Sequence, residues 1–295
     1  MSLRIISLSG EAPRLGPRCI RDLKGLGPSL GVSGSLEARL ATTKREIRQA
    51  QKLRYRVFIE NGAAAPDAPA RLIKRDVCRF DRVCDHLIVL DHAVRDARGR
   101  PKLVGAYRLL RQDVAQANFG FYSAAEFNLA PLLDRHVDKN FLELGRSCVA
   151  PDYRGKRALD LLWRGIWTYV SYHQIDALFG CASFAGTDPF AHGAAIGFLQ
   201  GRAPARPEWT ARAAPGRGVD IAAIACAPVE PRAAIRALPP LVKGYWRVGA
   251  QFGGDAVVDA AFGTTDVFVI MPVAEIDKRY IQYFADDREF APLAA

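Results

Sequence analysis

The stretch that decides the fold is Phe141-Leu-Glu-Leu-Gly-Arg-Ser-Cys-Val-Ala-Pro-Asp-Tyr-Arg-Gly-Lys-Arg-Ala-Leu-Asp-Leu-Leu-Trp-Arg164. Residues 141–149 predict a strand, which places Glu143 and Arg146 on opposite faces if it is regular. Gly145, inside this run, predicts a kink that would bring both side chains toward one cleft. Apolar residues at helical spacing follow and predict a helix directly behind a basic turn.

The turn between this strand and helix carries Arg154, Gly155, Lys156 and Arg157. The first N–H groups of a helix have no internal partners and the helix dipole favours negative charge, so a basic turn at this place suits an anion. An ordinary strand-to-helix turn with solvated basic side chains has the same composition. Evidence from the rest of the chain is needed to choose between an anion-binding site and an ordinary turn.

Composition narrows the class of protein. The chain has 295 residues, 41 basic and 31 acidic side chains, and a net charge of +10, which predicts acidic partners. We find no nucleic-acid recognition motif or aromatic-studded basic strand and expect no nucleic-acid partner. The six cysteines show no CxxC pair and no Cys/His metal spacing, so we expect reduced thiols and no metal. No apolar run of about 18 residues predicts a membrane span, and a cytoplasmic location follows as an expectation.

The chain divides into two parts of unequal size. Residues 1–40 are rich in Gly, Pro and Ser and predict a loose arm, and residues 41–295 predict a single domain without a linker or repeat. From Thr42 to Glu60 the pattern becomes helical and strongly basic, and Thr43 with Glu46 matches a capping box. A solvated face is the plain interpretation of this basic helix.

Strand-like runs surround the central motif. Residues 86–91 and 103–110 predict a hairpin with Arg108 in its second strand, either on a solvated face or turned toward a ligand. Residues 176–183 predict a strand parallel to 141–149, joined by a right-handed crossover. A helix is expected from Thr187 or Asp188 onward. Further strands are expected at 241–248, 256–261 and 266–271. The pattern predicts an α/β fold with a mixed sheet and helices on both faces.

A strand, basic turn, helix and parallel strand in this order resemble the acyl-donor core of GNAT-type acyltransferases, in which two central strands splay and admit pantetheine. More specific motifs over about residues 45–285 resemble the ornithine acyl-ACP N-acyltransferases. These motifs are Leu53-Arg-Tyr-Arg-Val-Phe58, Arg79-Phe-Asp81, Gly105-Ala-Tyr-Arg-Leu-Leu110, Phe127-Asn-Leu129, Leu142-Glu-Leu-Gly-Arg-Ser-Cys-Val149, Leu161-Leu-Trp-Arg-Gly165, Leu178-Phe-Gly-Cys-Ala-Ser-Phe184, Pro239-Pro-Leu-Val-Lys-Gly-Tyr-Trp-Arg247 and Thr264-Thr-Asp-Val267.

This resemblance implies an enzyme that transfers a 3-hydroxyacyl chain from acyl carrier protein to the α-amine of L-ornithine, giving lyso-ornithine lipid. The implied partners are acyl carrier protein, ornithine and the inner face of the cytoplasmic membrane, where the protein would bind peripherally. The donor thioester is carried on the phosphopantetheine of the carrier protein, so no metal or redox cofactor is implied. Lysine and glutamine stay open as acceptors, as do acyl-chain length and oligomeric state.

The chain also resembles acyl-homoserine-lactone synthases, and this similarity selects the catalytic candidates. The shared set is Arg56, Phe80-Asp81, Arg108, Glu143 and Arg146. Glu143 would take the proton of the attacking amine, directly or through a water. Arg146 or Arg108 would hold the ornithine carboxylate, and Asp81 would hold a substrate ammonium.

Arg56 and the backbone around Cys148 and Val149 complete the expected site. The backbone N–H groups at this end of the strand would stabilise the oxyanion of the tetrahedral intermediate. An α-amine has a pKa near 7.7–8.0, against about 10.4 for a lysine-like amine, so the α-amine is far more often neutral at neutral pH. The chemistry therefore favours acylation at the α position.

One departure from the GNAT pattern concerns the donor. The usual CoA-binding loop has two glycines after its Arg or Gln, and Arg157 and Leu159 stand at the corresponding positions here. Glycines let backbone amides close on a pyrophosphate, which bulky residues obstruct. We therefore expect acyl carrier protein rather than free CoA, docked on Arg154, Gly155, Lys156 and Arg157.

Two other functions fit parts of the sequence. An autoinducer synthase would use S-adenosylmethionine as the amine donor, but the C-terminal motifs between Lys243 and Asp266 and the longer chain disfavour it. A non-enzymatic, haemolysin-like protein of the membrane surface would fit the charge of +10. Such a protein has no need of the Glu143–Arg146 strand.

Overall fold

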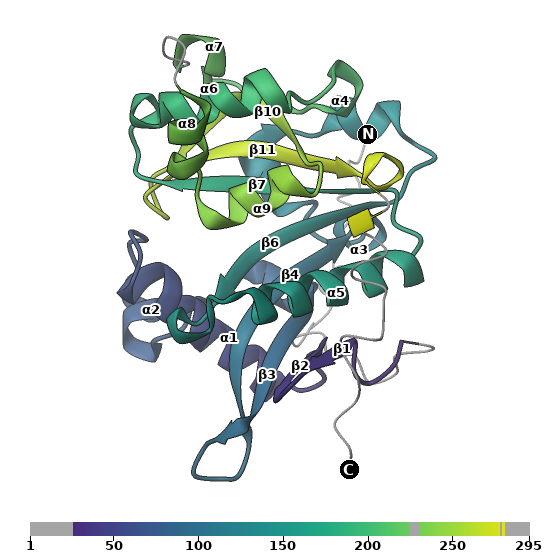
Figure 1. Cartoon of the computed structure of the whole chain (residues 1–295), viewed down its shortest axis with the longest axis vertical. Coiled ribbons are helices and arrows are strands. Elements are labelled where there is room, and N and C mark those ends of the chain that lie inside the picture. The colour runs from purple at the N-terminus through teal and green to yellow at the C-terminus, as the bar shows by residue number, and fades with distance from the viewer. Residues whose placement is uncertain (1–25, 225–229, 278, 281–295) are drawn as a thin grey trace, which may run out of the picture.

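A nine-stranded mixed sheet forms the middle layer of the molecule (Figure 1). The computed structural model describes residues 26–224, 230–277 and 279–280. The strands follow in the spatial order β1 (Gly31–Ser33), β2 (Leu36–Leu40), β3 (Asp85–Arg95), β4 (Pro101–Arg111), β6 (Phe141–Val149), β7 (Ala177–Ala185), β11 (Thr264–Pro272), β10 (Gln251–Asp259) and β9 (Gly218–Asp220). A separate two-stranded sheet pairs β5 (Phe127–Asn128) with β8 (Arg212–Ala213).

The strand pairing confirms the two central predictions. β3 and β4 form the expected antiparallel hairpin, with His86 opposite Arg108. β6 and β7 run parallel, as the crossover through a helix requires. All other neighbours in the nine-stranded sheet are antiparallel. The β6–β7 pair is therefore the place where the two antiparallel halves of the sheet meet.

β6 and β7 stay together for only part of their length. Each has nine residues, yet only Phe141, Leu142 and Glu143 of β6 pair with β7. Gly180 follows the last pair, and a Cβ there would lie 2.5 Å from the carbonyl oxygen of Leu144. Only glycine permits this approach. Beyond it the strands diverge, as Figure 1 shows, and the expected splay of the central strands is present.

Helices cover both faces of the sheet. α1 (Lys44–Arg54) packs against β4 and β6, and α5 (Lys156–Tyr172) packs across β2, β3 and β4 from the other side (Figure 1). The capping box at the start of α1 is present, because Thr43 accepts from the N–H of Glu46 and Glu46 accepts from the N–H of Thr43. The other α-helices are α2 (Ala68–Ile73), α3 (Gln112–Gln116), α4 (Ala130–Arg135), α6 (Gly193–Arg202), α7 (Ile221–Ile224), α8 (Pro231–Ala237) and α9 (Pro240–Arg247).

Two predictions of local structure are wrong. Residues 31–40 of the expected loose arm form β1 and β2, because Leu36 and Leu40 bury their side chains in the core while β2 pairs with β3; residues 1–25 lie outside the described residues. The run 241–248 is not a strand. It forms most of α9, where Pro240 fixes the first turn and Val242 and Tyr245 face the core.

The mixed α/β fold class with helices on both faces is confirmed. In the part of the chain that the structure describes, no helix is long and apolar enough to cross a membrane.

Candidate active site

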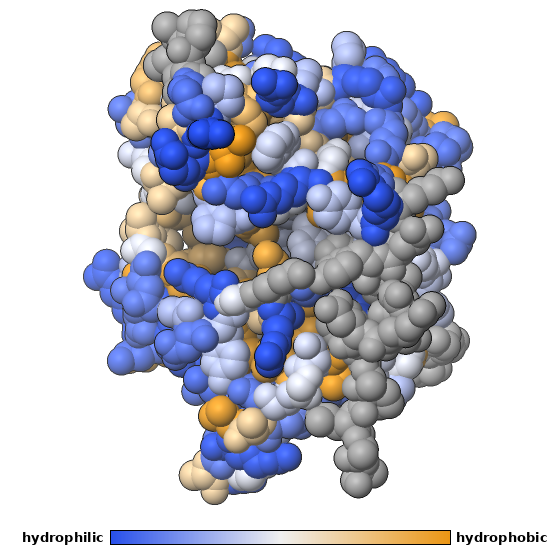
Figure 2. Space-filling view, viewed as in Figure 1, coloured by the Kyte–Doolittle hydropathy of each residue, from blue (hydrophilic) through white to orange (hydrophobic). Residues whose placement is uncertain are grey.

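The gap that opens between β6 and β7 contains a cavity of about 300 Å³. One wall is formed by residues 143–147 of β6 together with Tyr107 and Arg108 of β4, and the other by β7 and β11. α9 adds apolar side chains through Leu241 and Val242. Figure 2 shows a hollow on this face, between the half that carries β7 and the half that carries β6. Three of the expected catalytic residues, Arg108, Glu143 and Arg146, line this cavity.

A bulge in β6 shapes the first wall. Arg108 pairs with Gly145 and Ala106 pairs with Cys148, so Tyr107 alone faces two residues of β6, Arg146 and Ser147. Arg146 takes the extra position with a φ of 53°, a value that few non-glycine residues adopt. The expected kink is therefore present at Arg146 and not at Gly145. As a result, Glu143 and Arg146 line the same cavity.

Glu143 lies at the bottom of this wall with 4% of its surface exposed. Oε2 accepts from the N–H of Tyr122 at 2.8 Å, and Oε1 accepts from the N–H and hydroxyl of Ser123 at 2.7 and 2.5 Å. Burial raises the pKa of Glu143, although these hydrogen bonds and the charge of Arg108 offset part of the rise. A held carboxylate with a raised pKa is suited to accept a proton.

Two arginines lie beside Glu143. Arg108 is buried, stacks over the ring of Tyr122 and has no hydrogen-bond partner for its Nε among the described residues. Arg146 lies over the ring of Phe262 and donates from Nη2 to the hydroxyl of Tyr122 at 3.2 Å. Both guanidinium groups line the cavity, so this wall carries positive charge that can meet a substrate carboxylate.

Asp81 does not line the cavity, and its expected role as an ammonium ligand does not fit the structure. Its two oxygens accept from Nη1 and Nη2 of Arg54 at 2.8 and 2.7 Å, and Arg108 approaches to 3.4 Å. Burial alone would raise the pKa of Asp81, but the charge of Arg54 lowers it well below its ordinary value. Asp76 pairs with Arg54 at 2.9 Å and with Arg146 at 3.3 Å. The aspartates therefore hold the arginines in place.

Three other expected residues lie outside the cavity. Arg56 is exposed in the π-helical turn Tyr55–Glu60 that follows α1, and it lines a different, basic groove. Cys148 and Val149 pair with Ala106 and Gly105 of β4, and neither contacts the cavity. The sequence predicts Arg56 as a site residue, but in the structure it is Arg54 that forms the ion pair with Asp81 beside the cavity arginines. The helical spacing indicates that Arg54 is buried, because it follows the buried Ile47 by seven residues and so lies on the same face of the helix.

The expected docking loop lies at the start of α5. Gly155 is the N-cap residue, and α5 begins at Lys156. Arg154, Gly155 and Arg157 are exposed to solvent. None of these residues lines the cavity. The loop follows β6 along the chain and presents its charge on the outer surface.

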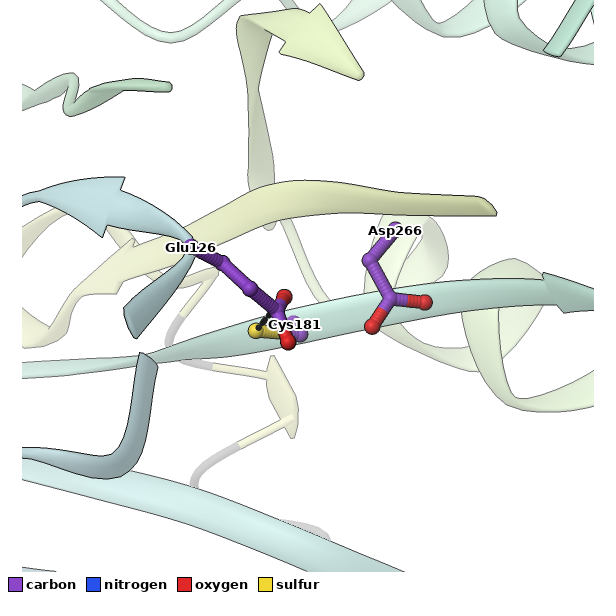
Figure 3. Close-up of side chains that lie close together, drawn as sticks. All are labelled: Glu126, Cys181 and Asp266. Atoms are coloured by element: carbon purple, nitrogen blue, oxygen red, sulfur yellow. Dashed lines mark hydrogen bonds between the residues drawn. The ribbon is translucent and has the colours of Figure 1, made fainter. Parts of the chain in front are cut away.

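The wall formed by β7 and β11 carries acidic residues that sequence reasoning did not assign. Asp266 and Cys181 line the cavity, and Glu126 lies next to them (Figure 3). One side-chain atom from each of these three residues lies within 4.8 Å of the others. The thiol of Cys181 donates to Oε2 of Glu126 at 3.2 Å. The sequence feature that could have indicated this acidic wall is Asp266, the single charged residue in the apolar run 266–271.

The electrostatics of this acidic wall differ from those around Glu143. Burial and the neighbouring Asp266 raise the pKa of Glu126 to about 7. Burial also raises the pKa of Asp266, with a partial offset from Ser183. The pKa of the Cys181 thiol is raised well above its ordinary value by burial and by Glu126. Each group is thus driven toward its uncharged form when the cavity holds no cation.

Comparison with known proteins agrees with this architecture. The family model described as an acetyltransferase (GNAT) domain matches residues 53–164, which extend from the end of α1 to the middle of α5. That range contains β3, β4, β6 and the basic turn before α5. It includes the wall of the cavity with Glu143 and both arginines.

Three curated relatives share most of their length with this chain, and all three are named L-ornithine N(alpha)-acyltransferase. The protein of Agrobacterium fabrum (strain C58) is 49% identical, and the match covers 91% of this chain and 90% of the relative. The protein of Rhizobium meliloti (strain 1021) is 48% identical, with 88% and 87% covered. The protein of Brucella abortus (strain 2308) is 45% identical, with 86% and 90% covered.

Proposed function

Because this chain belongs to the L-ornithine N(alpha)-acyltransferase family, we propose that it joins a 3-hydroxyacyl chain from acyl carrier protein to the α-amine of L-ornithine. The observation that carries this proposal is the cavity between the splayed strands. It places a buried carboxylate of raised pKa, Glu143, beside the guanidinium groups of Arg108 and Arg146. Acylation of an amino acid needs both a base for the amine and a cation for the carboxylate.

The donor would enter where β6 loses its partner. Beyond Glu143, the edge of β6 that faces β7 forms no strand pair among the described residues. An extended chain with amide groups can add to such an edge through backbone hydrogen bonds. The pantetheine arm is such a chain. It would lie along β6 with its thioester at the cavity, and the apolar side chains of Leu241 and Val242 would contact the first part of the acyl chain.

The reaction then proceeds in one covalent sequence. The neutral α-amine attacks the thioester carbon and forms a tetrahedral intermediate with a negative oxygen. Glu143 takes a proton from the attacking nitrogen, the intermediate expels the pantetheine thiolate, and that proton finally resides on the thiol. The products are the amide and the free carrier thiol. No step requires a metal or a redox cofactor.

The arginines supply the charge that the acceptor carboxylate needs. Among the described residues, Arg54, Arg108 and Arg146 form buried ion pairs with Asp76 and Asp81. The guanidinium groups of Arg108 and Arg146 line the cavity, where they can bind the carboxylate of the substrate. Arg108 is the better candidate, because the Nε of Arg146 lies 3.3 Å from Asp76, whereas the buried Nε of Arg108 has neither a hydrogen-bond nor an ion-pair partner among the described residues.

Acyl carrier protein is preferred over free CoA because of the loop before α5. Its exposed Arg154 and Arg157 suit an acidic protein surface. The positions where GNAT loops carry glycine for a pyrophosphate hold Arg157 and Leu159. The basic turn at the exit of β6 also lies next along the chain to the strand that would hold the pantetheine arm.

The amphiphilic product suggests a peripheral position at the inner face of the cytoplasmic membrane. The groove between α1 and the β3–β4 hairpin supports this part of the proposal, because it combines exposed cations with the exposed apolar side chains of Ile73 and Val94. Its cations are Arg45, Arg48, Lys52, Arg56, Arg75, Arg95, Arg100 and Lys102. Basic clusters of this kind bind anionic lipid. Sedimentation with phosphatidylglycerol vesicles should be lost in high salt and should not occur with phosphatidylcholine vesicles.

The function is tested by incubating the purified protein with 3-hydroxyacyl carrier protein and either ornithine or S-adenosylmethionine. Mass spectrometry should find lyso-ornithine lipid acylated at the α-amine in the first mixture. Formation of an acyl-homoserine lactone in the second mixture would instead identify an autoinducer synthase. Absence of both products, with folded protein and intact donor, would contradict the enzymatic assignment.

A further inference from the structure

The acidic wall of the cavity contains a buried carboxylate, Asp266, with one oxygen that no described residue satisfies. Asp266 lies in β11 between β7 and β10, with 4% of its surface exposed, and it lines the cavity. Its Oδ1 has no hydrogen-bond partner among the described residues. A buried oxygen without a hydrogen-bond partner is costly, and a ligand in the cavity would supply the missing donor.

Glu126 makes this wall more acidic. One of its oxygens lies within 4.8 Å of Asp266, and 4% of its surface is exposed. Within the described residues, neither carboxylate forms an ion pair with an arginine or lysine. Two buried carboxylates at this separation cannot both ionise at low cost unless a cation lies between them or beside them.

An ammonium group fits this wall better than a metal ion does. The third group of the cluster is the thiol of Cys181, which already donates a hydrogen bond to Oε2 of Glu126. A metal such as zinc would bind a cysteine at this position as the thiolate. A primary ammonium has three donors and no acceptor, and Asp266, which lines the cavity, has an oxygen, Oδ1, without a hydrogen-bond partner among the described residues.

The two walls are thus complementary to a diamino acid. Arg108 and Arg146 on the β4–β6 wall offer positive charge, and Asp266 on the opposite wall, with Glu126 within 4.8 Å of it, offers negative charge. We propose that Asp266, supported by Glu126, binds the side-chain ammonium of the acceptor and thereby decides which of its two amines is acylated. This proposal rests on the proposed function, because it presumes an amino acid acceptor in the cavity. With the carboxylate on the arginines and the side-chain ammonium on Asp266, the α-amine is left for Glu143.

The test compares ornithine with norvaline, which has the same carbon chain without the side-chain amine. We expect wild-type protein to show an ornithine to norvaline ratio of kcat/KM of about 10–100, the value of a charged hydrogen bond. Asp266→Asn should reduce this ratio to near one, mainly through the KM for ornithine. It should also raise the share of product acylated on the side-chain amine. Because the ratio does not depend on the fraction of active protein, partial misfolding does not affect the result.

Two further variants complete the experiment. Glu126→Gln should lower the ratio by a smaller factor, and Asp134→Asn, the same kind of change at an exposed position of α4, should leave it at the wild-type value. Wild-type protein that acylates no ornithine would overturn the proposed function together with this inference. Wild-type protein that acylates ornithine, with an unchanged ratio in Asp266→Asn, would overturn this inference alone. Stoichiometric zinc in the wild type that is lost in Asp266→Asn would also overturn it.

Discussion

Arg54 and Asp81 form a two-point ion pair beneath the cavity, with Nη1 to Oδ1 at 2.8 Å and Nη2 to Oδ2 at 2.7 Å. Arg54 is 1% exposed and Asp81 is 2% exposed. The same aspartate contacts Arg108, and the same arginine contacts Asp76, which in turn holds Arg146. The position of both cavity arginines therefore depends on one buried pair that touches no substrate.

The first prediction concerns this pair. Asp81→Asn should lower the free energy of unfolding by about 3–5 kcal/mol, because it leaves Arg54 as a buried charge without its main partner. Chemical denaturation followed by circular dichroism measures the change. Arg56→Ala is the matched control, since Arg56 is exposed two residues away on the same helical segment and should change stability by no more than about 0.5 kcal/mol. Equal effects of both variants would contradict this assignment.

The second prediction concerns the proposed base. Glu143→Gln should lower kcat by roughly 10²–10⁴ while the protein stays folded, the usual range for a lost general base. Near-normal turnover would remove Glu143 from the mechanism. If the KM for ornithine rises more than kcat falls, Glu143 binds the substrate ammonium rather than taking its proton.

Ser123 provides a separate check on Glu143. Its hydroxyl donates to Oε1 and lowers the pKa of the carboxylate, against the rise caused by burial. In Ser123→Ala that pKa should rise further. A base must be ionised to act, so the acidic limb of the pH dependence of kcat should move to higher pH. A limb that stays in place would mean that another group sets it.

The sequence predicts the middle of this fold well because the evidence there is local. An alternating run, a basic turn and an amphipathic helix define β6 and α5, and the crossover rule makes β7 parallel. The secondary structure at the edges of the fold depends on tertiary packing instead. The run 241–248 has strand-like composition, but Pro240 and the burial of Val242 and Tyr245 make it helical. Similarly, 31–40 contains loop-forming residues that become strands only because β2 pairs with β3.

The site was predictable on one wall only. Glu143, Arg146 and Arg108 belong to neighbouring strands whose pairing follows from the sequence pattern, and all three line the cavity. Asp266 reaches the same cavity from β11, which is more than a hundred residues away along the chain. Nothing in local pattern places β11 beside β7. The choice of Arg56 over Arg54 was avoidable, because Arg54 lies in α1 seven residues after the buried Ile47, whereas Arg56 lies in the π-helical turn Tyr55–Glu60 that follows.

The third prediction concerns Glu126 and pH. A carboxylate whose pKa is about 7 when folded and ordinary when unfolded binds a proton more tightly in the folded state. Its contribution to stability is therefore full below about pH 4.5 and declines as the pH rises toward 7. Glu126→Gln removes this decline and should be more stable than wild type at pH 8, by up to about 3 kcal/mol. The two proteins should differ much less at pH 5. A constant difference across this range would show that ionisation of Glu126 is not responsible.

The fourth prediction concerns the loop before α5 and the choice of donor. Changing both Lys156 and Arg157 to Glu should raise the apparent KM for 3-hydroxyacyl carrier protein, because the loop would then repel an acidic partner. The KM for ornithine should barely change. The matched control changes Arg232 and Arg236 to Glu, which alters the net charge equally at exposed positions of α8.

Two measurements distinguish docking of the carrier protein on this loop from a general effect of net charge: the salt dependence of the KM and the choice of acyl donor. The wild-type KM for the carrier protein should rise with ionic strength, since attraction between surface charges is screened beyond a Debye length of about 8–10 Å. The loop variant should lose most of this salt dependence, whereas the α8 variant should keep it. Wild-type protein should also use 3-hydroxyacyl carrier protein faster than 3-hydroxyacyl-CoA at matched concentration, because Arg157 and Leu159 obstruct the closing of backbone amides around a pyrophosphate. Equal rates with the two donors would show that the missing glycines do not matter and that the loop does not select the carrier protein.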